Sequence, residues 1–281
     1  MNIFPSQFML LISMLTANIL YSNDTLAGLD KKTIFELMDI LNVKPLSNEL
    51  SDIVIATQKA WLRKGERWET DDLHEEKKEI LLPLFKKFGL IDSWMPKEKN
   101  YDGILFLGSG NLSVENKINF LITLFKEGLT IKPITLLTGQ RYLTFNEIKK
   151  LISIGADKNT MITEKDMMEF IINNELHLAN LSNIEITVID TQGKRDAEGI
   201  YSRPTTIDTV IEWLKINPKP GHYLVLSFQP HCLYQLTILK TALPSTITIE
   251  VIGDEAKNTR VAVILDAITR TLYAYEKGLS K

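Results

Sequence analysis

From Tyr101 onward, short apolar segments alternate with stretches of helical periodicity. Five segments are predicted to be strands, at 101–107, 134–137, 184–189, 223–226 and 246–252. The first ends in a continuous apolar run, which is typical of a strand buried on both faces. Helical patterns follow them at 111–128, 146–154, 163–178, about 205–214, 233–242 and in a closing segment that starts near 261. Strands that alternate with helices are joined by right-handed crossovers into a mostly parallel sheet. The sequence therefore predicts an α/β fold with flanking helices.

The region before this alternation has a different character. Residues 28–100 carry three helical patterns, at about 31–41, 47–64 and 74–88, with Asp30 as the expected cap of the first and Gly89 as the end of the third. The charged stretch 63–78 mixes both signs, which is typical of a solvated surface. We expect an extra helical region here, followed by an α/β domain with its closing helix over 101–281.

The first 27 residues resemble a targeting segment. No charged side chain precedes Asp24, and an apolar run extends from Phe8 to Leu20. Small residues over 25–28 suit a cleavage site, although no Lys or Arg precedes the run. Three interpretations stay open: a cleaved export signal, an uncleaved anchor and a buried N-terminal helix. The first two predict an exported or envelope-associated protein, with membrane association through this segment only, and the third a cytoplasmic one.

Composition excludes several classes of function. The net charge of −3 gives no global electrostatic case for binding nucleic acid. Cys232 is the only cysteine, so the chain has no internal disulfide and no multi-cysteine zinc site. The four histidines are not clustered at metal-ligand spacing, and we expect no catalytic metal. A small-molecule ligand is the expected partner, and the oligomeric state stays open.

The carboxyl ends of the predicted strands define the expected site, because ligands of parallel α/β sheets bind there. The first strand runs into Gly108-Ser109-Gly110-Asn111, a turn whose N–H groups can approach an anion at a helix N-terminus. Ser113 stands where the dinucleotide fingerprint has its third glycine, and no Walker motif is present. The turn is thus either a tight connection or the cradle of a phosphate, carboxylate or nucleotide-type ligand.

His231 follows the fourth predicted strand, where a histidine can act as a general base or hydrogen-bond donor. A catalytic pair with the adjacent Cys232 competes with a simpler interpretation of that cysteine as a small buried hydrophobe. Glu164 is a second candidate catalytic residue, although a carboxylate in the first turn of a helix also favours the helix dipole. A hydrolase that uses His231 is an alternative, but the sequence has no nucleophile elbow.

The order of these turns resembles the YdcF/SanA/ElyC-like family of bacterial domains of unknown function. The resemblance covers roughly 101–252, and the closing helix also fits. After the first turn, the family has a helix with a basic residue, a leucine-tyrosine-like pair and a closing glycine, and this chain has Lys117, Leu124-Phe125 and Gly128. The second strand ends in a small-residue turn, here Thr138-Gly139-Gln140, and a later helix opens with a Thr-Glu step, here Thr163-Glu164. The remaining matches are the segment from Ser202 to Asp208 and the strand that leads into Ser227 and His231. The sequence departs from the family pattern at Pro204, Ile207, Asp208 and Tyr234.

The resemblance implies a Rossmann-like fold, a nucleotide-type ligand such as S-adenosylmethionine, and a role linked to the bacterial envelope. On this interpretation His231 and Glu164 orient the ligand or exchange protons with it. The net charge of −3 is compatible with a locally positive pocket near Lys117 and Arg141. The ligand-binding residues are expected to be Gly108, Ser109, Gly110, Asn111, Lys117, Gly139, Gln140, Arg141, Thr205, Asp208 and Ser227. The alternative is a non-catalytic interaction protein that keeps the fold and has lost the site.

Overall fold

The computed structural model describes residues 25–63, 72–195, 197–199, 201–256 and 258–279. By its contacts the chain divides into two compact units. One unit contains the described residues of 1–90 and 259–281, and the other is the segment 91–258. The sequence grouped the closing helix with the α/β domain, whereas the contacts group it with the N-terminal helices. The predicted targeting segment from Phe8 to Leu20 lies outside the described residues.

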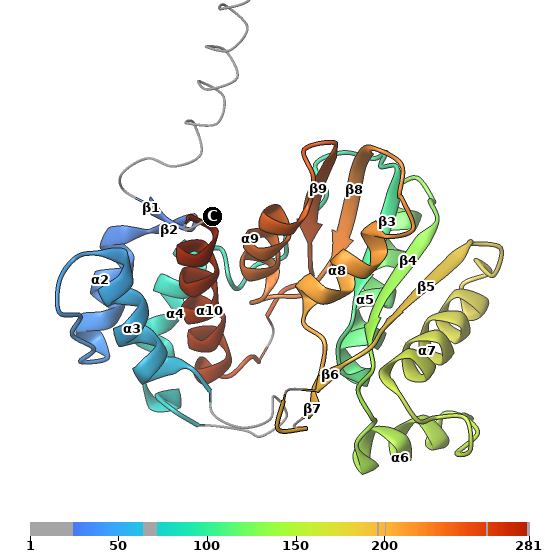
Figure 1. The fold of residues 1–281 in the computed structure, drawn as a ribbon, viewed down its shortest axis with the longest axis horizontal. Coiled ribbons are helices and arrows are strands. Elements are labelled where there is room, and N and C mark those ends of the chain that lie inside the picture. Colours follow the sequence, from blue (N-terminus) through green and yellow to red (C-terminus); the bar gives the residue numbers. More distant parts are fainter. Residues whose placement is uncertain (1–24, 64–71, 196, 200, 257, 280–281) are drawn as a thin grey trace, which may run out of the picture. The chain divides into compact units, whose positions relative to one another are not determined.

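A five-stranded parallel sheet forms the centre of the second unit (Figure 1). Its strands are β3 (Gly103–Leu107), β4 (Ile134–Gly139), β5 (Ile186–Thr191), β8 (Gly221–Leu226) and β9 (Ile247–Ile252), in the order β5-β4-β3-β8-β9. All five residues of the central strand β3 are buried, as the continuous apolar run predicts for a strand covered on both faces. The predicted α/β class and the parallel sheet are confirmed, and the fold is Rossmann-like.

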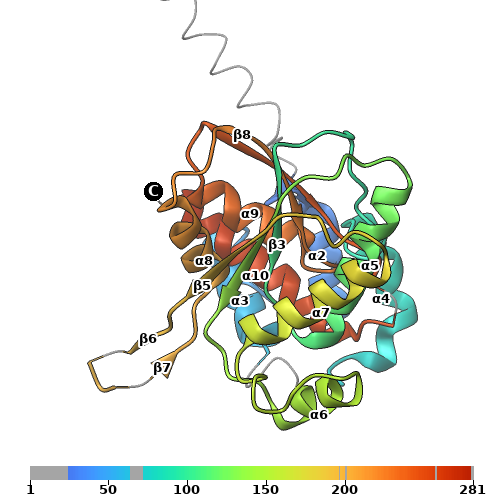
Figure 2. The same cartoon turned by 90° about the vertical axis from the view of Figure 1, so that its right-hand side faces the viewer.

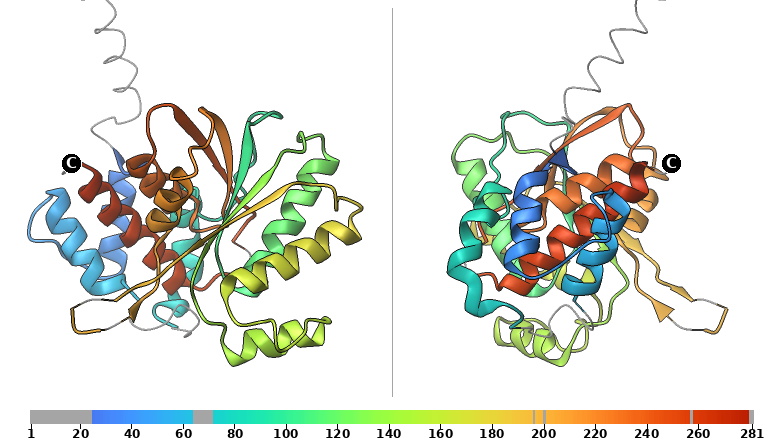
Figure 3. Two further views of the ribbon diagram at one scale, coloured as in Figure 1. Left: turned by 45° about the vertical axis from the view of Figure 1, so that its right-hand side comes forward. Right: turned by 90° about the vertical axis from the view of Figure 1, so that its left-hand side faces the viewer.

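Helices cover both faces of this sheet (Figure 3). Helices α5 (Asn111–Lys126) and α7 (Glu164–Leu178) pack together on one face, and α8 (Thr206–Leu214) and α9 (Cys232–Ala242) pack together on the other. The short helix α6 (Phe145–Ser153) lies between β4 and α7 in the sequence. The connections from β3 to β4 and from β4 to β5 cross one face of the sheet, and those from β5 to β8 and from β8 to β9 cross the other. The direction in which successive strands are added therefore reverses between β3 and β8, which makes this position a topological switch point.

A two-stranded ribbon that the sequence analysis missed interrupts the connection from β5 to α8. Strand β6 (Lys194–Arg195) pairs antiparallel with β7 (Tyr201–Ser202), and the ribbon projects beyond the carboxyl end of β5 (Figure 2). The guanidinium of Arg195 lies 5.8 Å from the ring centroid of Tyr201. Strands of two residues carry too little periodicity to be recognised in a sequence.

The helical unit confirms the three helices predicted before residue 90. Its described residues form α2 (Lys31–Ile40), α3 (Leu50–Trp61), α4 (Lys78–Lys87) and α10 (Val261–Leu279), and a 3₁₀ turn at Glu75–Lys77 precedes α4. Asp30 caps α2 as expected, since its Oδ2 accepts the N–H of Thr33 at 2.8 Å. Helix α10 packs against α3 and α4. The described part of the unit starts with a short antiparallel pair, β1 (Thr25–Leu26) with β2 (Leu29–Asp30), which the sequence did not predict.

No helix in the described part of the chain has both the length and the apolar character needed to cross a membrane.

Capping boxes begin three consecutive helices of the sheet unit. In α7 the hydroxyl of Thr163 accepts the N–H of Asp166, and the Asp166 carboxylate accepts the N–H of Thr163 at 2.8 Å. Helices α6 and α8 start in the same way at Thr144 and Thr205. Each box fixes where its helix begins, and those of α6 and α8 so fix the end of the segment that connects the helix to the preceding strand.

Replacing Thr163 with alanine is expected to lower the free energy of unfolding by about 1 kcal/mol, because the first turn of α7 loses its side-chain acceptor. Thr163→Ser keeps the hydroxyl and should retain most of the stability. Urea denaturation of the two variants beside the wild type measures the difference. Equal midpoints for alanine and serine would show that the box contributes nothing.

Candidate functional site

The loops at the carboxyl ends of β3 and β8 meet where the winding of the sheet changes direction. The first residue after β3, Gly108, donates its N–H to the carbonyl of Leu137 on β4 at 3.0 Å. The first residue after β8, Ser227, donates its N–H to Ile252 at the end of β9 at 2.9 Å. The turn 108–110 and the loop 227–231 therefore leave adjacent strands toward opposite faces. Such a switch point is where open α/β sheets bind their ligands.

Lys117 is buried under this switch point. It lies on the inner face of α5 with 2% of its surface exposed, and its Nζ donates a hydrogen bond to the carbonyl of Leu107, the last residue of β3. The Nζ lies 4.5 Å from the ring centroid of Phe106 and 5.9 Å from that of Phe228, which belongs to the β8 loop. Burial lowers the pKa of Lys117 to about 7, although the negative charge of Glu164 opposes this shift. The side chain thus titrates near neutral pH.

Glu164 approaches the same place from the β4 side. It is the first residue of α7, and its side chain turns inward, where Oε2 accepts the N–H of Gly139 at 3.2 Å. A Cβ at Gly108 would stand 3.0 Å from that oxygen, so only a glycine leaves the carboxylate its full space. Burial raises the pKa of Glu164 above its ordinary value, against the influence of Arg141, the Gly139 N–H and Lys117. Its position in the first helical turn is therefore only part of its role.

Arg141 joins Glu164 to a second carboxylate that the sequence analysis did not select. Its Nε lies 3.8 Å from Glu164 Oε1, and its two terminal nitrogens form a bidentate pair with Glu147 at 2.8 and 2.9 Å. Burial opposes ionisation of Glu147, but Arg141 and the N–H of Thr144 hold its pKa below the ordinary value. The spacing of Thr144 and Glu147 is that of a capping box, which is the signal that identifies Glu147 in the sequence.

The glycine turn leaves backbone donors at the start of α5. Gly110 is the N-cap residue and has no side chain to cap the helix, while Asn111 accepts the N–H of Leu112 at 2.8 Å. A Cβ at Gly110 would meet only Glu147 Oε1, at 3.5 Å. The hydroxyl of Ser109 is buried and has no hydrogen-bond partner among the described residues. A buried hydroxyl without a partner is unfavourable unless a ligand or water completes it.

His231 and Ser227 lie on the β8 side of the switch point. The ring of His231 packs edge-to-face on Phe228 with centroids 4.9 Å apart, and Phe228 is the residue whose ring also lies near Lys117. Ser227 is buried beside Cys232. Cys232 is fully buried, and this burial raises the pKa of its thiol to about 12. The thiol therefore stays protonated at neutral pH, as suits a small buried hydrophobe and not the nucleophile of a Cys-His pair.

Thr205 and Asp208 are engaged with each other in the capping box of α8. The Asp208 carboxylate also pairs with Lys194 of the ribbon at 2.5 Å. Partial burial opposes its ionisation, but Lys194 and Thr205 lower the pKa of Asp208 to about 2. Both residues were predicted to bind a ligand, and the structure gives their polar groups local partners.

The loop after β4 is covered by the segment that leads into α8. Gln140 donates its N–H to Thr191 at the end of β5 at 2.8 Å, and its carbonyl accepts the hydroxyl of Tyr201. A Cβ at Gly139 would stand 2.7 Å from the Pro204 ring. The Pro204 ring therefore packs directly on a glycine, and a side chain at position 139 would displace it.

No group of three His, Cys, Asp or Glu side chains suited to a metal ion occurs in the described part of the structure. A comparison of the chain with protein-family models found no match, and a comparison with curated proteins also found none.

Proposed function

We propose that this chain binds a small anionic or nucleotide-type molecule at the switch point between β3 and β8. The observation that carries the proposal is the burial of Lys117 beneath the glycine turn, with Nζ between a strand-end carbonyl and two aromatic rings. Burying an ammonium group is unfavourable, and its pKa near 7 reflects that cost. Strongly perturbed ionisable groups are concentrated at functional sites.

The surrounding groups suit an anion. The uncapped N–H groups at the start of α5 and the Ser109 hydroxyl offer donors to a phosphate or carboxylate, and Lys117 adds positive charge beneath them. Glu164 and His231 flank this position and are the groups proposed to orient the ligand or exchange protons with it. The resemblance to the YdcF/SanA/ElyC-like family supports S-adenosylmethionine as the first ligand to test and an envelope-linked role.

A non-catalytic interaction protein is the second candidate. The side chains of several predicted ligand-binding residues bond within the chain: Thr205 and Asp208 in a helix cap, and Arg141 in a bidentate pair with Glu147. A protein that keeps this fold but no longer binds a ligand would still retain these internal hydrogen bonds. A hydrolase that uses His231 has less support, because the thiol next to it has a pKa of about 12.

We expect the full chain to gain thermal stability with at least one member of a panel of nucleotides, S-adenosylmethionine and inorganic phosphate, since a ligand at one hundred times its Kd adds about 2.7 kcal/mol. Gly110→Val should remove this gain while lowering the stability of the ligand-free protein by no more than about 1 kcal/mol. The reason is that a side chain at Gly110 meets only one carboxylate oxygen of the protein, at 3.5 Å, and would project into the space proposed for the anion.

Mass spectrometry of small molecules that co-purify with the protein widens the search beyond the panel. A flat melting temperature across the panel together with no co-purified molecule would reject the anion site and favour the interaction protein. A gain that Gly110→Val retains would place the ligand elsewhere on the chain.

A further inference from the structure

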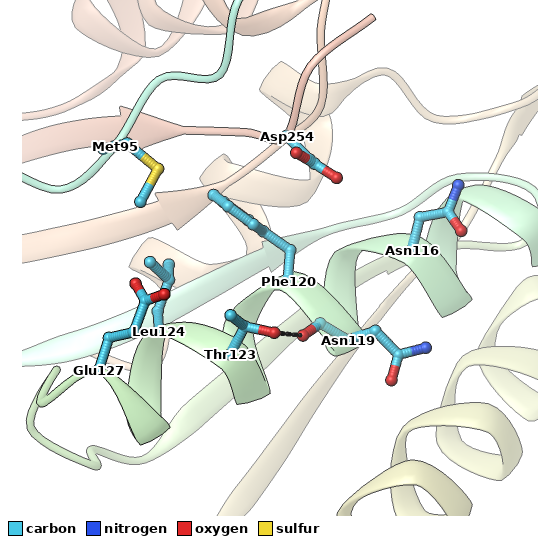
Figure 4. A pocket seen from close by; sticks show the side chains of 8 residues that line it. All are labelled: Met95, Asn116, Asn119, Phe120, Thr123, Leu124, Glu127 and Asp254. Carbon is cyan, nitrogen blue, oxygen red and sulfur yellow. Dashed lines mark hydrogen bonds between the residues drawn. The ribbon is translucent and has the colours of Figure 1, made fainter. Parts of the chain in front are cut away.

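An open hollow of about 410 Å³ lies beside α5, within the sheet unit (Figure 4). Six of its eight lining residues recur along one face of this helix: Asn116, Asn119, Phe120, Thr123, Leu124 and Glu127. Met95, from the segment before β3, and Asp254, from the loop after β9, complete the lining. Lys117 does not line the hollow, because its side chain turns toward the sheet, where its Nζ donates to the carbonyl of Leu107.

The hollow combines an aromatic ring, aliphatic contacts and two carboxylates. Figure 4 shows Phe120 extending from α5 between Met95 and Asp254, with Glu127 toward one end and Asn116 toward the other. The Asp254 carboxylate is held in place because its Oδ1 accepts the Ser93 hydroxyl at 3.1 Å and the Glu255 N–H at 2.8 Å. The eight lining residues, all within the described part of the chain, include no Lys, Arg or His.

This lining complements an organic cation. An ammonium group is attracted both by a carboxylate and by the face of an aromatic ring, and methylene groups pack on Met and Leu side chains. Figure 4 shows Asp254 beside Phe120, and helix α5 rises about 10 Å from Phe120 to Glu127, at 1.5 Å per residue, so the two carboxylates are separated along the hollow. A single ammonium group would satisfy only one of them.

We infer that this hollow binds an aliphatic di- or triamine, with one ammonium group near Asp254 and Phe120, another near Glu127, and the methylene chain along Met95 and Leu124. The amide side chains of Asn116 and Asn119 supply carbonyl acceptors for the remaining N–H groups. The ligand has the opposite charge to that proposed for the switch point, and neither proposal depends on the other.

Calorimetric titration of the full chain with spermidine, putrescine and the matched monoamine butylamine tests the inference. Putrescine is expected to bind at least three-fold more tightly than butylamine because it reaches both carboxylates. Glu127→Gln and Asp254→Asn should each weaken putrescine binding about two- to five-fold, and Phe120→Leu by a similar factor through loss of the ring face. Asparagine at 254 keeps a carbonyl for Ser93 and Glu255, so the loop is retained.

Two further variants distinguish specific binding in the hollow from nonspecific electrostatic attraction of a cation to a protein with a net charge of −3. Glu185→Gln makes the same change of charge just before β5, at the opposite edge of the sheet from β9, and should leave putrescine binding unchanged. Lys99 has its Nζ 3.3 Å from where a Cβ on Gly128 would stand, beside Glu127, so Lys99→Gln should tighten binding by removing a competing cation. Equal binding of butylamine and putrescine, or equal losses at Glu127 and Glu185, would overturn the inference.

Discussion

Replacing Lys117 with methionine is expected to make the stability of the protein less dependent on pH between 7 and 10. Methionine fills a similar volume among Phe106, Phe228 and the end of β3 without carrying a charge that burial penalises. The wild type should therefore gain stability relative to Lys117→Met as the pH rises through this range. We expect this relative gain to be about 3 kcal/mol, from a shift of the pKa from 10.5 to about 7.

The direction follows from the protons that each state binds. Burial lowers the pKa of Lys117 in the folded protein, so between about pH 7 and 10.5 the unfolded chain holds a proton that the folded chain has lost. Stability rises with pH wherever the unfolded state binds more protons. Below about pH 7 the full cost of the buried charge is present, and above about 10.5 it has disappeared.

Glu164 produces the opposite slope in a lower pH window. Because burial raises its pKa, the folded state holds its proton more firmly than the unfolded chain, and stability falls as the pH rises from the ordinary glutamate value to the raised one. Lys117 is one of the charges that favour ionised Glu164. The Lys117→Met variant should therefore titrate Glu164 at a still higher pH.

Chemical denaturation of wild type and variant at pH 7, 8, 9 and 10 measures these differences. Lys126→Met, in the last turn of the same helix but on its exposed side, is the matched control and should follow the wild type at each pH. A constant difference between the wild type and Lys117→Met from pH 7 to 10 would mean that Lys117 titrates as a solvated lysine, and it would remove the main support for the proposed anion site.

The fold was predictable from the sequence because the central strands β3 and β4 are buried almost throughout and end at a change of residue type. The apolar run of β3 stops at Gly108, and that of β4 ends in Gly139 and Gln140. The order β5-β4-β3-β8-β9 needed the structure. Apolar periodicity shows that a strand is buried but not which strands are its neighbours, so the switch point between β3 and β8 could not be located.

The candidate site was less predictable, because its chemistry depends on the directions of side chains. Sequence analysis selected Lys117 and Glu164, yet an amphipathic pattern does not show that the lysine lies on the buried face of α5 or that the carboxylate turns toward the Gly139 N–H. The bidentate partner of Arg141 is Glu147, and its capping-box spacing was the available signal. Thr205 had the same signal, three residues before Asp208, and its cap was equally readable.

Introducing alanine at Gly253 is expected to lower the free energy of unfolding by about 3 kcal/mol or more. Gly253 follows β9 and pairs with Trp94 through two backbone hydrogen bonds, of 2.8 and 3.1 Å. A Cβ there would stand 2.6 Å from the Cys232 Sγ and 2.8 Å from the Cα of Phe228. Since the second contact is with backbone, no change of rotamer relieves it, and overpacking of this kind is strongly destabilising. Thermal and urea unfolding measure the loss.

Two comparisons isolate the cause of this loss. Gly110→Ala, also a glycine in a turn beyond a strand end, should change stability by less than about 1 kcal/mol, because its Cβ would meet only Glu147 Oε1 at 3.5 Å. Adding Cys232→Ala to Gly253→Ala removes the clash with sulfur but not the clash with Phe228, so it should restore only part of the stability. Complete restoration would show that the β8 loop can move away. In that case the contact with Gly253 would not hold Phe228 in place, and the ring near Lys117 could move. The proposed binding site at the switch point requires that this loop be rigid.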